Sequence, residues 1–308
     1  MSVTLSNPTS SAVMEALRRE ASTAGSAART LAFTLIVDAL SQGPKQLAGW
    51  EDVAMEAAAT HPCRLILLTR DPDRSSFPSS PLEVEVSGWS RSCPTERLRV
   101  TVPFVDSPRI EAVLRGVLAN DVPVVCWWPC GTPTALQLEI MSKFVQRRVF
   151  DSGSGDDPLL ALQTIRSEYR PGDSDLSWGR VSALRSLVTA SLDWRGGEVV
   201  RAEVEMGSVA SALLVGNWIE RLTGARVEYV DTTEECTRLV LQCRTEDGED
   251  YRLRFEQEDG RFFTVAMDDH EPLRHVGPST SPSSLLSTEL DHFGEDRMFR
   301  DVLEGLSL

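Results

Sequence analysis

The chain has 308 residues, enough for two domains of roughly 150 residues each. Hydrophobic residues make up 41% of it and charged residues 25%, a globular composition that excludes wholesale disorder and fibrous repeats. The 31 lysines and arginines against 46 aspartates and glutamates give a net charge of −15 without a basic patch, so nucleic acid is not an expected partner.

No apolar run approaches the roughly 20 residues that a membrane-spanning helix needs, and the first residues lack the basic and apolar segments of a secretory signal. The sequence therefore predicts a soluble, cytoplasmic protein with no membrane partner. Six cysteines are too few to staple a chain of this length, so we expect reduced thiols. These cysteines are Cys63, Cys93, Cys126, Cys130, Cys236 and Cys243.

Apolar segments alternate with helical patterns in the first half of the chain. Helices are expected from Ser10 or Ser11, over 47–60, 108–118 and 134–146, and after an Asp157 cap. The predicted strands are 29–39, 64–69, 82–89, 97–104, 122–128 and 149–150. Most are almost continuously apolar, as in a sheet covered on both faces, but 82–89 and 97–104 alternate in polarity and indicate antiparallel strands. This pattern predicts an α/β domain with a mixed sheet over residues 1–170.

The second half follows a different order. One helix is expected at 176–192, another between a Ser208 cap and Gly224, and a last one through Leu303. The predicted strands are 198–206, 226–230, 237–242, 250–256 and 261–267, with a hairpin turn at 258–260. A strand, a helix, an antiparallel meander and a helix predict an α+β domain over residues 171–308.

The sequence carries none of the short motifs of common catalytic sites, such as a phosphate-binding P-loop, a nucleophile elbow or a zinc-binding His-Glu-x-x-His. The turn Gly153-Ser154-Gly155 lies between a strand and a helix, where a phosphate can bind. However, Asp156 and Asp157 would repel an anion there, so we expect an ordinary helix start. The histidines lack the spacing and partners of a metal or catalytic site, so no metal and no cofactor are predicted. They are His61, His270, His275 and His292.

One segment is unusual, Cys126-Trp127-Trp128-Pro129-Cys130. Neighbouring side chains of a strand point to opposite faces, and Pro129 places the two indoles at the carboxyl end of the strand, where α/β sheets hold ligands. Either helices cover both faces and bury both rings, or at least one ring is exposed and anchors a partner. Cys126 and Cys130 are expected to be reduced, since a regulatory disulfide would have to close across Pro129.

Several short motifs resemble, in the right chain order, those of one known family. They are His61-Pro62-Cys63-Arg64, Pro123-Val124-Val125-Cys126-Trp127-Trp128-Pro129, Arg147-Arg148-Val149-Phe150-Asp151, Leu176-Ser177-Trp178-Gly179-Arg180 and Phe299-Arg300-Asp301-Val302-Leu303. On these motifs the chain resembles the OpcA family, the glucose-6-phosphate dehydrogenase assembly proteins, along nearly its whole length. Cys63 replaces the family's usual serine and Cys126 lies beside the tryptophan pair, which leaves a redox role open.

The resemblance implies a non-catalytic protein that binds glucose-6-phosphate dehydrogenase, promotes its active oligomer and regulates the oxidative pentose phosphate pathway. Under this hypothesis, Trp127, Trp128 and Pro129 form a rigid anchor in the interface or its immediate support. His61 and Arg64 would line the same end of the sheet, and the acidic surface would steer the chain towards basic patches on the dehydrogenase.

Two other functions stay open. The first is an enzyme acting on sugar phosphates or nucleotides, with His61 as acid and base in the cleft at the sheet end. Its phosphate would be held by Arg64, Arg147 and Arg148, although these arginines would serve equally well in ion pairs with the surplus carboxylates, or Arg64 in a phosphate effector site. The second is a thiol-redox sensor built on the two cysteines that flank the tryptophan pair.

Overall fold

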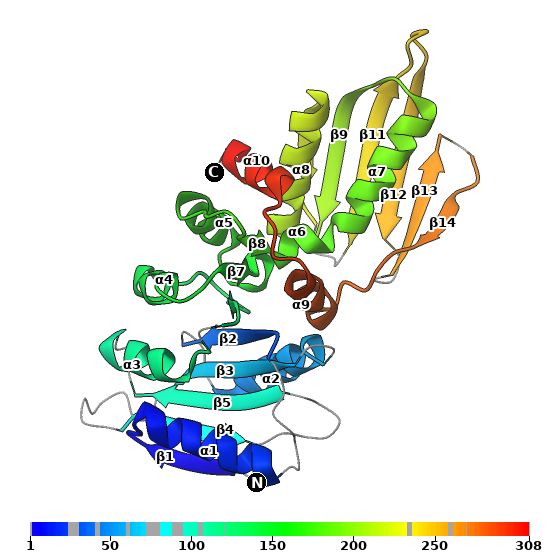
Figure 1. Ribbon diagram of the computed structural model, residues 1–308. Coiled ribbons are helices and arrows are strands. Elements are labelled where there is room, and N and C mark those ends of the chain that lie inside the picture. Colours follow the sequence, from blue (N-terminus) through cyan, green and yellow to red (C-terminus); the bar gives the residue numbers. More distant parts are fainter. Residues whose placement is uncertain are drawn as a thin grey trace. The chain divides into compact units, whose positions relative to one another are not determined.

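A computed structural model of the chain describes residues 2–23, 31–40, 44–59, 62–71, 81–87, 95–103, 107–119, 121–232, 236–257, 261–268 and 270–307 (Figure 1). The chain divides into two compact units. Unit 1 consists of Met1–Phe150 and Leu286–Gly294, and unit 2 of Asp151–Leu285 and Glu295–Leu308. The domain boundary predicted from the sequence lies later in the chain, after residue 170. The helix Pro158–Ser167, which lies between residues 150 and 170, packs within unit 2.

Unit 1 is built on a sheet whose strands lie in the order β1-β4-β5-β3-β2-β6-β7. The strands are β1 (Ser2–Ser6), β2 (Phe33–Ala39), β3 (Cys63–Arg70), β4 (Glu83–Ser87), β5 (Thr95–Val102), β6 (Val124–Trp127) and β7 (Arg147–Phe150). The helices are α1 (Ser10–Thr23), α2 (Pro44–Ala57), α3 (Ser107–Val117) and α4 (Ala135–Ser142). Strands β5, β3, β2, β6 and β7 pair in parallel, whereas β4 pairs antiparallel with β1 and β5. The predicted α/β domain with a mixed sheet is therefore confirmed.

The central strands of unit 1 form its core. Every residue of β2, β6 and β7 is buried, and β3 is exposed only at Arg70. On β4, buried residues alternate with half-exposed ones, as its alternating polarity predicts. Each fully buried Leu, Ile or Val of these strands contributes about 1.5–3 kcal/mol to folding, which explains why the apolar runs alone locate the strands.

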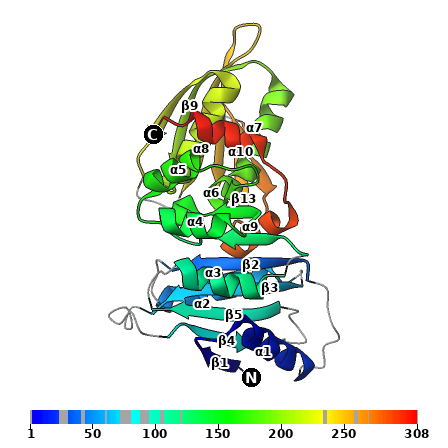
Figure 2. The same cartoon turned by 60° about the vertical axis from the view of Figure 1, so that its left-hand side comes forward.

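Unit 2 has the expected α+β order. Its strands are β8 (Ser174–Asp175), β9 (Glu198–Met206), β10 (Arg226–Val230), β11 (Thr237–Arg244), β12 (Asp250–Gln257), β13 (Phe262–Met267) and β14 (Leu273–Val276). Its helices are α5 (Pro158–Ser167), α6 (Leu176–Arg180), α7 (Ser182–Arg195), α8 (Val209–Thr223) and α10 (Arg297–Gly305). A sheet of order β10-β9-β11-β12-β13-β14 is antiparallel except between β9 and β10, and α8 packs against those two strands. Figure 2 shows α8 beside β9.

Some predicted elements differ from the observed ones. The helix expected at 176–192 is broken into α6 and α7, because Gly179 weakens the helix and Val181 leaves the helical conformation (φ −97°, ψ 8°). The last helix is divided into α9 (Pro282–Asp291), within which the two units divide, and α10. Strands β1 and β14 were not predicted, and the hairpin turn at 258–260 lies outside the described residues.

Candidate functional site

The strand order of unit 1 reverses at β2. This strand pairs in parallel with β3 on one side and with β6 on the other. The chain continues from β2 to β3 on the first side and only later adds β6 on the second side. In open parallel sheets, ligands bind at the carboxyl ends of the strands that flank such a point. Here these ends carry Asp38, the second-last residue of β2, and Trp128, which directly follows β6.

The side chains at this point bind one another. The Trp128 indole Nε1 donates a hydrogen bond to Asp38 Oδ2 (3.0 Å). Gln137 of α4 donates from Nε2 to Asp38 Oδ1 (2.9 Å), and the backbone N–H of Leu40 donates to the same oxygen (3.1 Å). The Trp128 ring stacks on Phe150 at the end of β7, with 5.0 Å between ring centroids. The protein's own indole therefore fills the position where a ligand would bind.

Burial governs the ionisation of the groups around this indole. Burial raises the pKa of the Asp38 carboxyl. Hydrogen bonds from Leu40, Gln137 and Trp128 oppose this rise. Burial also raises the pKa of the Cys126 thiol well above its ordinary range, and the nearby Asp38 charge adds to this effect. Reactive cysteines instead have a lowered pKa. Cys126 and Cys130 are not joined by a disulfide.

The tryptophan segment is part of the core of unit 1. Trp127 and Trp128 are 1% and 2% exposed, and Pro129 is also buried. Of the two alternatives left open by the sequence, the one in which both rings are buried is therefore correct, and the one with an exposed indole is wrong. All four residues of β6 are buried, so side chains on both faces of this strand are internal, as in a parallel sheet that is covered on both faces.

Arg64 lies at the opposite end of the sheet from Trp128. It is paired in register with Thr34, which pairs with Val124, whereas Trp127 pairs with Val37. Because β3, β2 and β6 are parallel, a residue near the start of β3 aligns with the start of β6. The expectation that Arg64 lines the tryptophan end is therefore wrong, and His61 lies outside the described residues.

The three arginines of the expected cluster are held apart. Arg64 pairs with Glu96 (2.6 Å), and Arg147 pairs with Glu289. The Arg148 guanidinium lies over the Phe150 ring, 5.6 Å from its centroid. Strands β3 and β7 are separated by β2 and β6, which places their backbones about 14 Å apart. These positions correspond to ion pairs and ring contacts rather than to a shared phosphate site.

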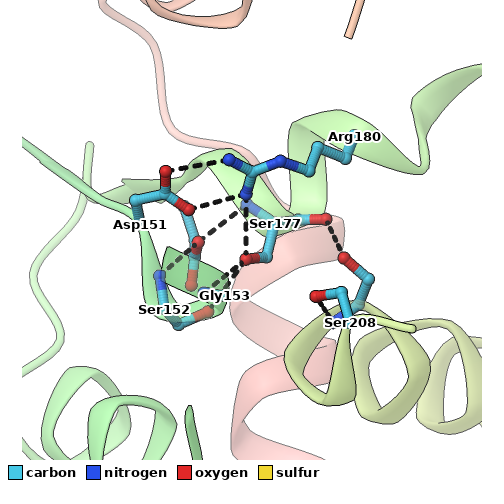
Figure 3. A network of polar contacts seen from close by, with 8 residues as sticks. Asp151, Ser152, Gly153, Ser177, Arg180 and Ser208 are labelled. Atoms are coloured by element: carbon cyan, nitrogen blue, oxygen red, sulfur yellow. Dashed lines mark hydrogen bonds and ion pairs between the residues drawn. The ribbon is translucent and has the colours of Figure 1, made fainter. Parts of the chain in front are cut away.

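A second buried polar network lies in unit 2 and joins two of the sequence motifs (Figure 3). Asp151 ends the motif 147–151, and Arg180 ends the motif 176–180. The Arg180 guanidinium binds both carboxylate oxygens of Asp151 (2.6 and 2.9 Å). Ser177 Oγ accepts a hydrogen bond from the Gly153 N–H (2.9 Å) and lies 3.1 Å from Ser152 Oγ. The Gly153 N–H is thus used internally, and Asp157 caps α5, so the expected ordinary helix start is confirmed.

Asp175 forms the inner part of this network. Its Oδ1 accepts hydrogen bonds from the backbone N–H groups of Ser177 (2.8 Å) and Ser152 (3.2 Å). Its Oδ2 is buried and has no hydrogen-bond partner among the described residues. Burial raises the pKa of the Asp175 carboxyl; a hydrogen bond from Ser152 opposes the rise, and the charge of Asp151 adds to it.

Comparison with known families identifies the chain. One family model, described as the N-terminal domain of the glucose-6-phosphate dehydrogenase subunit, matches residues 54–167, and the model of the C-terminal domain matches residues 171–303. The chain belongs to the OpcA family. The resemblance inferred from the motifs is thereby confirmed, and the two family domains fall in the two halves of the sequence.

Solved structures give only a distant likeness to this OpcA-family chain. KijD10, a 3-ketoreductase from Actinomadura kijaniata, is 10% identical with a TM-score of 0.49, covering 89% of this chain and 94% of that one. A dehydrogenase from Chromobacterium violaceum is 10% identical with a TM-score of 0.44, covering 90% and 95%. A search of curated proteins gives no match. At such identities, the likeness concerns the fold alone.

The described part of the OpcA-family chain contains neither a membrane-spanning helix nor a cluster of metal ligands. Within it, no helix has both the length and the apolar character needed to cross a membrane. Over the same residues, no three His, Cys, Asp or Glu side chains come together in a way that would hold a metal ion.

Sequence reasoning missed the acidic residues of both networks in this OpcA-family chain. Asp38 is the one charged residue in the apolar run 31–39, and that exception was a usable signal of a buried, bonded carboxylate. Asp151 and Arg180 lie in motifs that were recognised, but nothing in the sequence indicated that they meet. Gln137 and Asp175 carry no signal that separates them from surface residues.

Replacing Gly153 with alanine is expected to destabilise unit 2. A Cβ at this position would lie 2.8 Å from Ser177 Oγ and 2.9 Å from Ser208 Oγ, and Ser208 is fixed as the N-cap of α8. Such overpacking costs about 1–3 kcal/mol. The measurement is the free energy of unfolding in urea, with Gly294→Ala, where a Cβ meets no atom within 4 Å, as the control. Equal costs for the two variants would contradict the close packing at Gly153.

Replacing Asp175 with asparagine is expected to change how stability depends on pH. Because the pKa of Asp175 is raised on folding, its contribution to stability is present below the unfolded pKa, about 3.9, and is lost as pH rises through the higher folded value. Asparagine keeps the Oδ1 acceptor without this loss. The unfolding free energy of the variant relative to wild type should therefore rise as the pH increases from the unfolded pKa through the higher folded one. A difference that is flat with pH would show that Asp175 is not perturbed.

Proposed function

We propose that this OpcA-family chain is a non-catalytic assembly factor and allosteric activator. It binds glucose-6-phosphate dehydrogenase in the cytoplasm and promotes the active oligomer of that enzyme in the oxidative pentose phosphate pathway. The observation that carries the proposal is the match of both halves of the chain to domains of the glucose-6-phosphate dehydrogenase subunit family. An activator of this kind binds the active form of the enzyme more tightly than the inactive form, and the difference sets the degree of activation.

The filled sheet end supports the non-catalytic part of the proposal. The Trp128 indole, bonded to Asp38 and stacked on Phe150, takes up the place where α/β enzymes hold a ligand. The arginines considered for a phosphate site serve other contacts, with Arg64 and Arg147 in ion pairs. These contacts favour an interaction protein over an enzyme acting on sugar phosphates or nucleotides.

Within this proposal, the buried tryptophan segment supports the interface and does not form its surface. Trp127, Trp128 and Pro129 fix the end of β6, and Asp38 and Gln137 connect that end to β2 and α4. Arg64 connects β3 to β5 through Glu96 and to α3 through the carbonyl of Val117. Rigid contacts at both ends of the sheet lower the entropy cost of binding a partner.

The direct test is to mix the purified chain with the dehydrogenase. We expect the two to co-purify, and the chain to increase the active oligomer and shift the substrate saturation curve of the enzyme, by roughly 5- to 150-fold in apparent affinity for typical allosteric coupling. A chain that turns over a metabolite by itself would contradict the proposal. Unchanged assembly and kinetics of the dehydrogenase in the mixture would do the same.

A further inference from the structure

Unit 2 contains an aromatic platform that neither the family match nor the proposed function explains. Trp178 of α6 is 4% exposed, and its indole Nε1 donates a hydrogen bond to Asp296 Oδ2 (2.8 Å). Its ring packs against Phe299 of α10, with 6.0 Å between centroids. Asp296 also accepts a hydrogen bond from the backbone N–H of Phe299 as the N-cap of α10. The indole is therefore fixed in position.

Arg185 of α7 covers this platform. The central carbon of its guanidinium lies 3.5 Å from the centroid of the Trp178 ring, well within the range of a cation–π contact. Stacking uses the face of the guanidinium and leaves its edge, which carries the N–H donors, for bonds in its own plane. Arg180, five residues earlier, shows such in-plane bonding, since it binds both oxygens of Asp151.

The edge of Arg185 has no acceptor in the described part of the chain. Its Nε is buried without a hydrogen-bond partner, and no ion pair joins this residue to any described carboxylate, although the chain has 46 acidic residues against 31 basic ones. Asp296 is the acid whose charge acts on Arg185. Its two oxygens already accept hydrogen bonds from the Trp178 indole and from the backbone N–H of Phe299. Leaving the donors of a half-buried guanidinium unpaired is costly, because they lose water without gaining an acceptor.

The ionisation of Arg185 agrees with this geometry. Burial lowers the pKa of the guanidinium to about 10, and the Asp296 charge opposes the shift only in part. An oxyanion that bound the edge of the guanidinium would remove this penalty and gain charge-assisted hydrogen bonds in a partly desolvated place.

We propose that Trp178 and Arg185 form a receptor for an oxyanion, with the indole as platform and the guanidinium edge formed by Nη1 and Nη2 as donor, since Nε itself is buried. Both a carboxylate and a phosphate present two oxygens at the spacing that the guanidinium binds bidentately. The two sources of this chemistry are a free phosphate and a carboxylate of the dehydrogenase. Only the second source rests on the proposed function.

The first arm of the test uses the full-length chain alone. Its thermal unfolding midpoint is measured against rising inorganic phosphate, and separately acetate, at an ionic strength held constant with chloride. We expect a saturable rise for wild type that is lost in Arg185→Met, which keeps an apolar stem over the indole. Arg252→Met is the control, because Arg252 is an exposed arginine of the same unit and should leave the rise unchanged.

The second arm measures the affinity of the same variants for glucose-6-phosphate dehydrogenase. A loss of about tenfold or more in Arg185→Met, with Arg252→Met unchanged, assigns the oxyanion to the partner protein. A response in the first arm alone assigns it to a free anion. If Arg185→Met follows wild type in both arms, the receptor is refuted, whereas a wild-type chain that does not bind the dehydrogenase at all refutes the proposed function and leaves the first arm decisive.

Discussion

Replacing Trp128 with alanine is expected to lower the free energy of unfolding by about 3–5 kcal/mol. The indole is 2% exposed, stacks on Phe150 and donates to Asp38, so its removal opens a cavity and leaves Asp38 Oδ2 without its hydrogen bond. A typical domain is stable by only about 5–15 kcal/mol, so this single change should bring unit 1 close to unfolding at ambient temperature. Urea unfolding of the full-length chain, followed by circular dichroism, measures the loss.

Two further variants separate the causes of that loss. Trp128→Phe keeps a ring over Phe150 and removes the donor to Asp38, and it should cost about 1–3 kcal/mol, the penalty of one unsatisfied buried acceptor. Trp194→Ala removes an indole that is 76% exposed, and it should change stability by less than about 0.5 kcal/mol. If Trp128→Ala costs no more than Trp194→Ala, the filled sheet end is not part of the core and the argument against a ligand at this position fails.

Long apolar runs made the central strands predictable. Residues of β2, β3 and β6 are buried on both faces, so the runs in the sequence had no competing interpretation. The predicted bounds of β9 and β10 match the observed ones because a clear alternation or a helix cap marks their ends. The four residues of β14 are all exposed, and such an edge strand has no periodicity that could reveal it.

The site was only partly predictable. Pro129 correctly located the tryptophan pair at the end of a strand, but whether the rings are buried depends on contacts with residues far away in the chain. Asp38 and Gln137 are 90 and 99 positions from their partners in this network. The misplacement of Arg64 has a related cause, since its end of the sheet is set by the direction of neighbouring strands, and local sequence does not encode that direction.

Replacing Arg180 with glutamine is expected to lower the free energy of unfolding by about 3–5 kcal/mol, because it leaves the carboxylate of Asp151 buried and unpaired. Asp151 is 2% exposed, and the carboxyl of Asp175 lies in the same network, so the unpaired carboxylate would be left buried near a second acid. The measurement is again unfolding in urea. The matched control is Arg244→Gln, which breaks the exposed pair with Asp250 and should cost about 0–1 kcal/mol.

A second change at the same pair shows where the energy lies. Adding Asp151→Asn to Arg180→Gln removes the stranded charge, so the double variant should recover a large part of the stability that the single variant loses. If the pair contributed mainly by its mutual attraction, the double variant would be no more stable than the single one. Recovery would mean that the two family motifs ending at Asp151 and Arg180 are linked, because the buried Asp151 is tolerated only while Arg180 neutralises it.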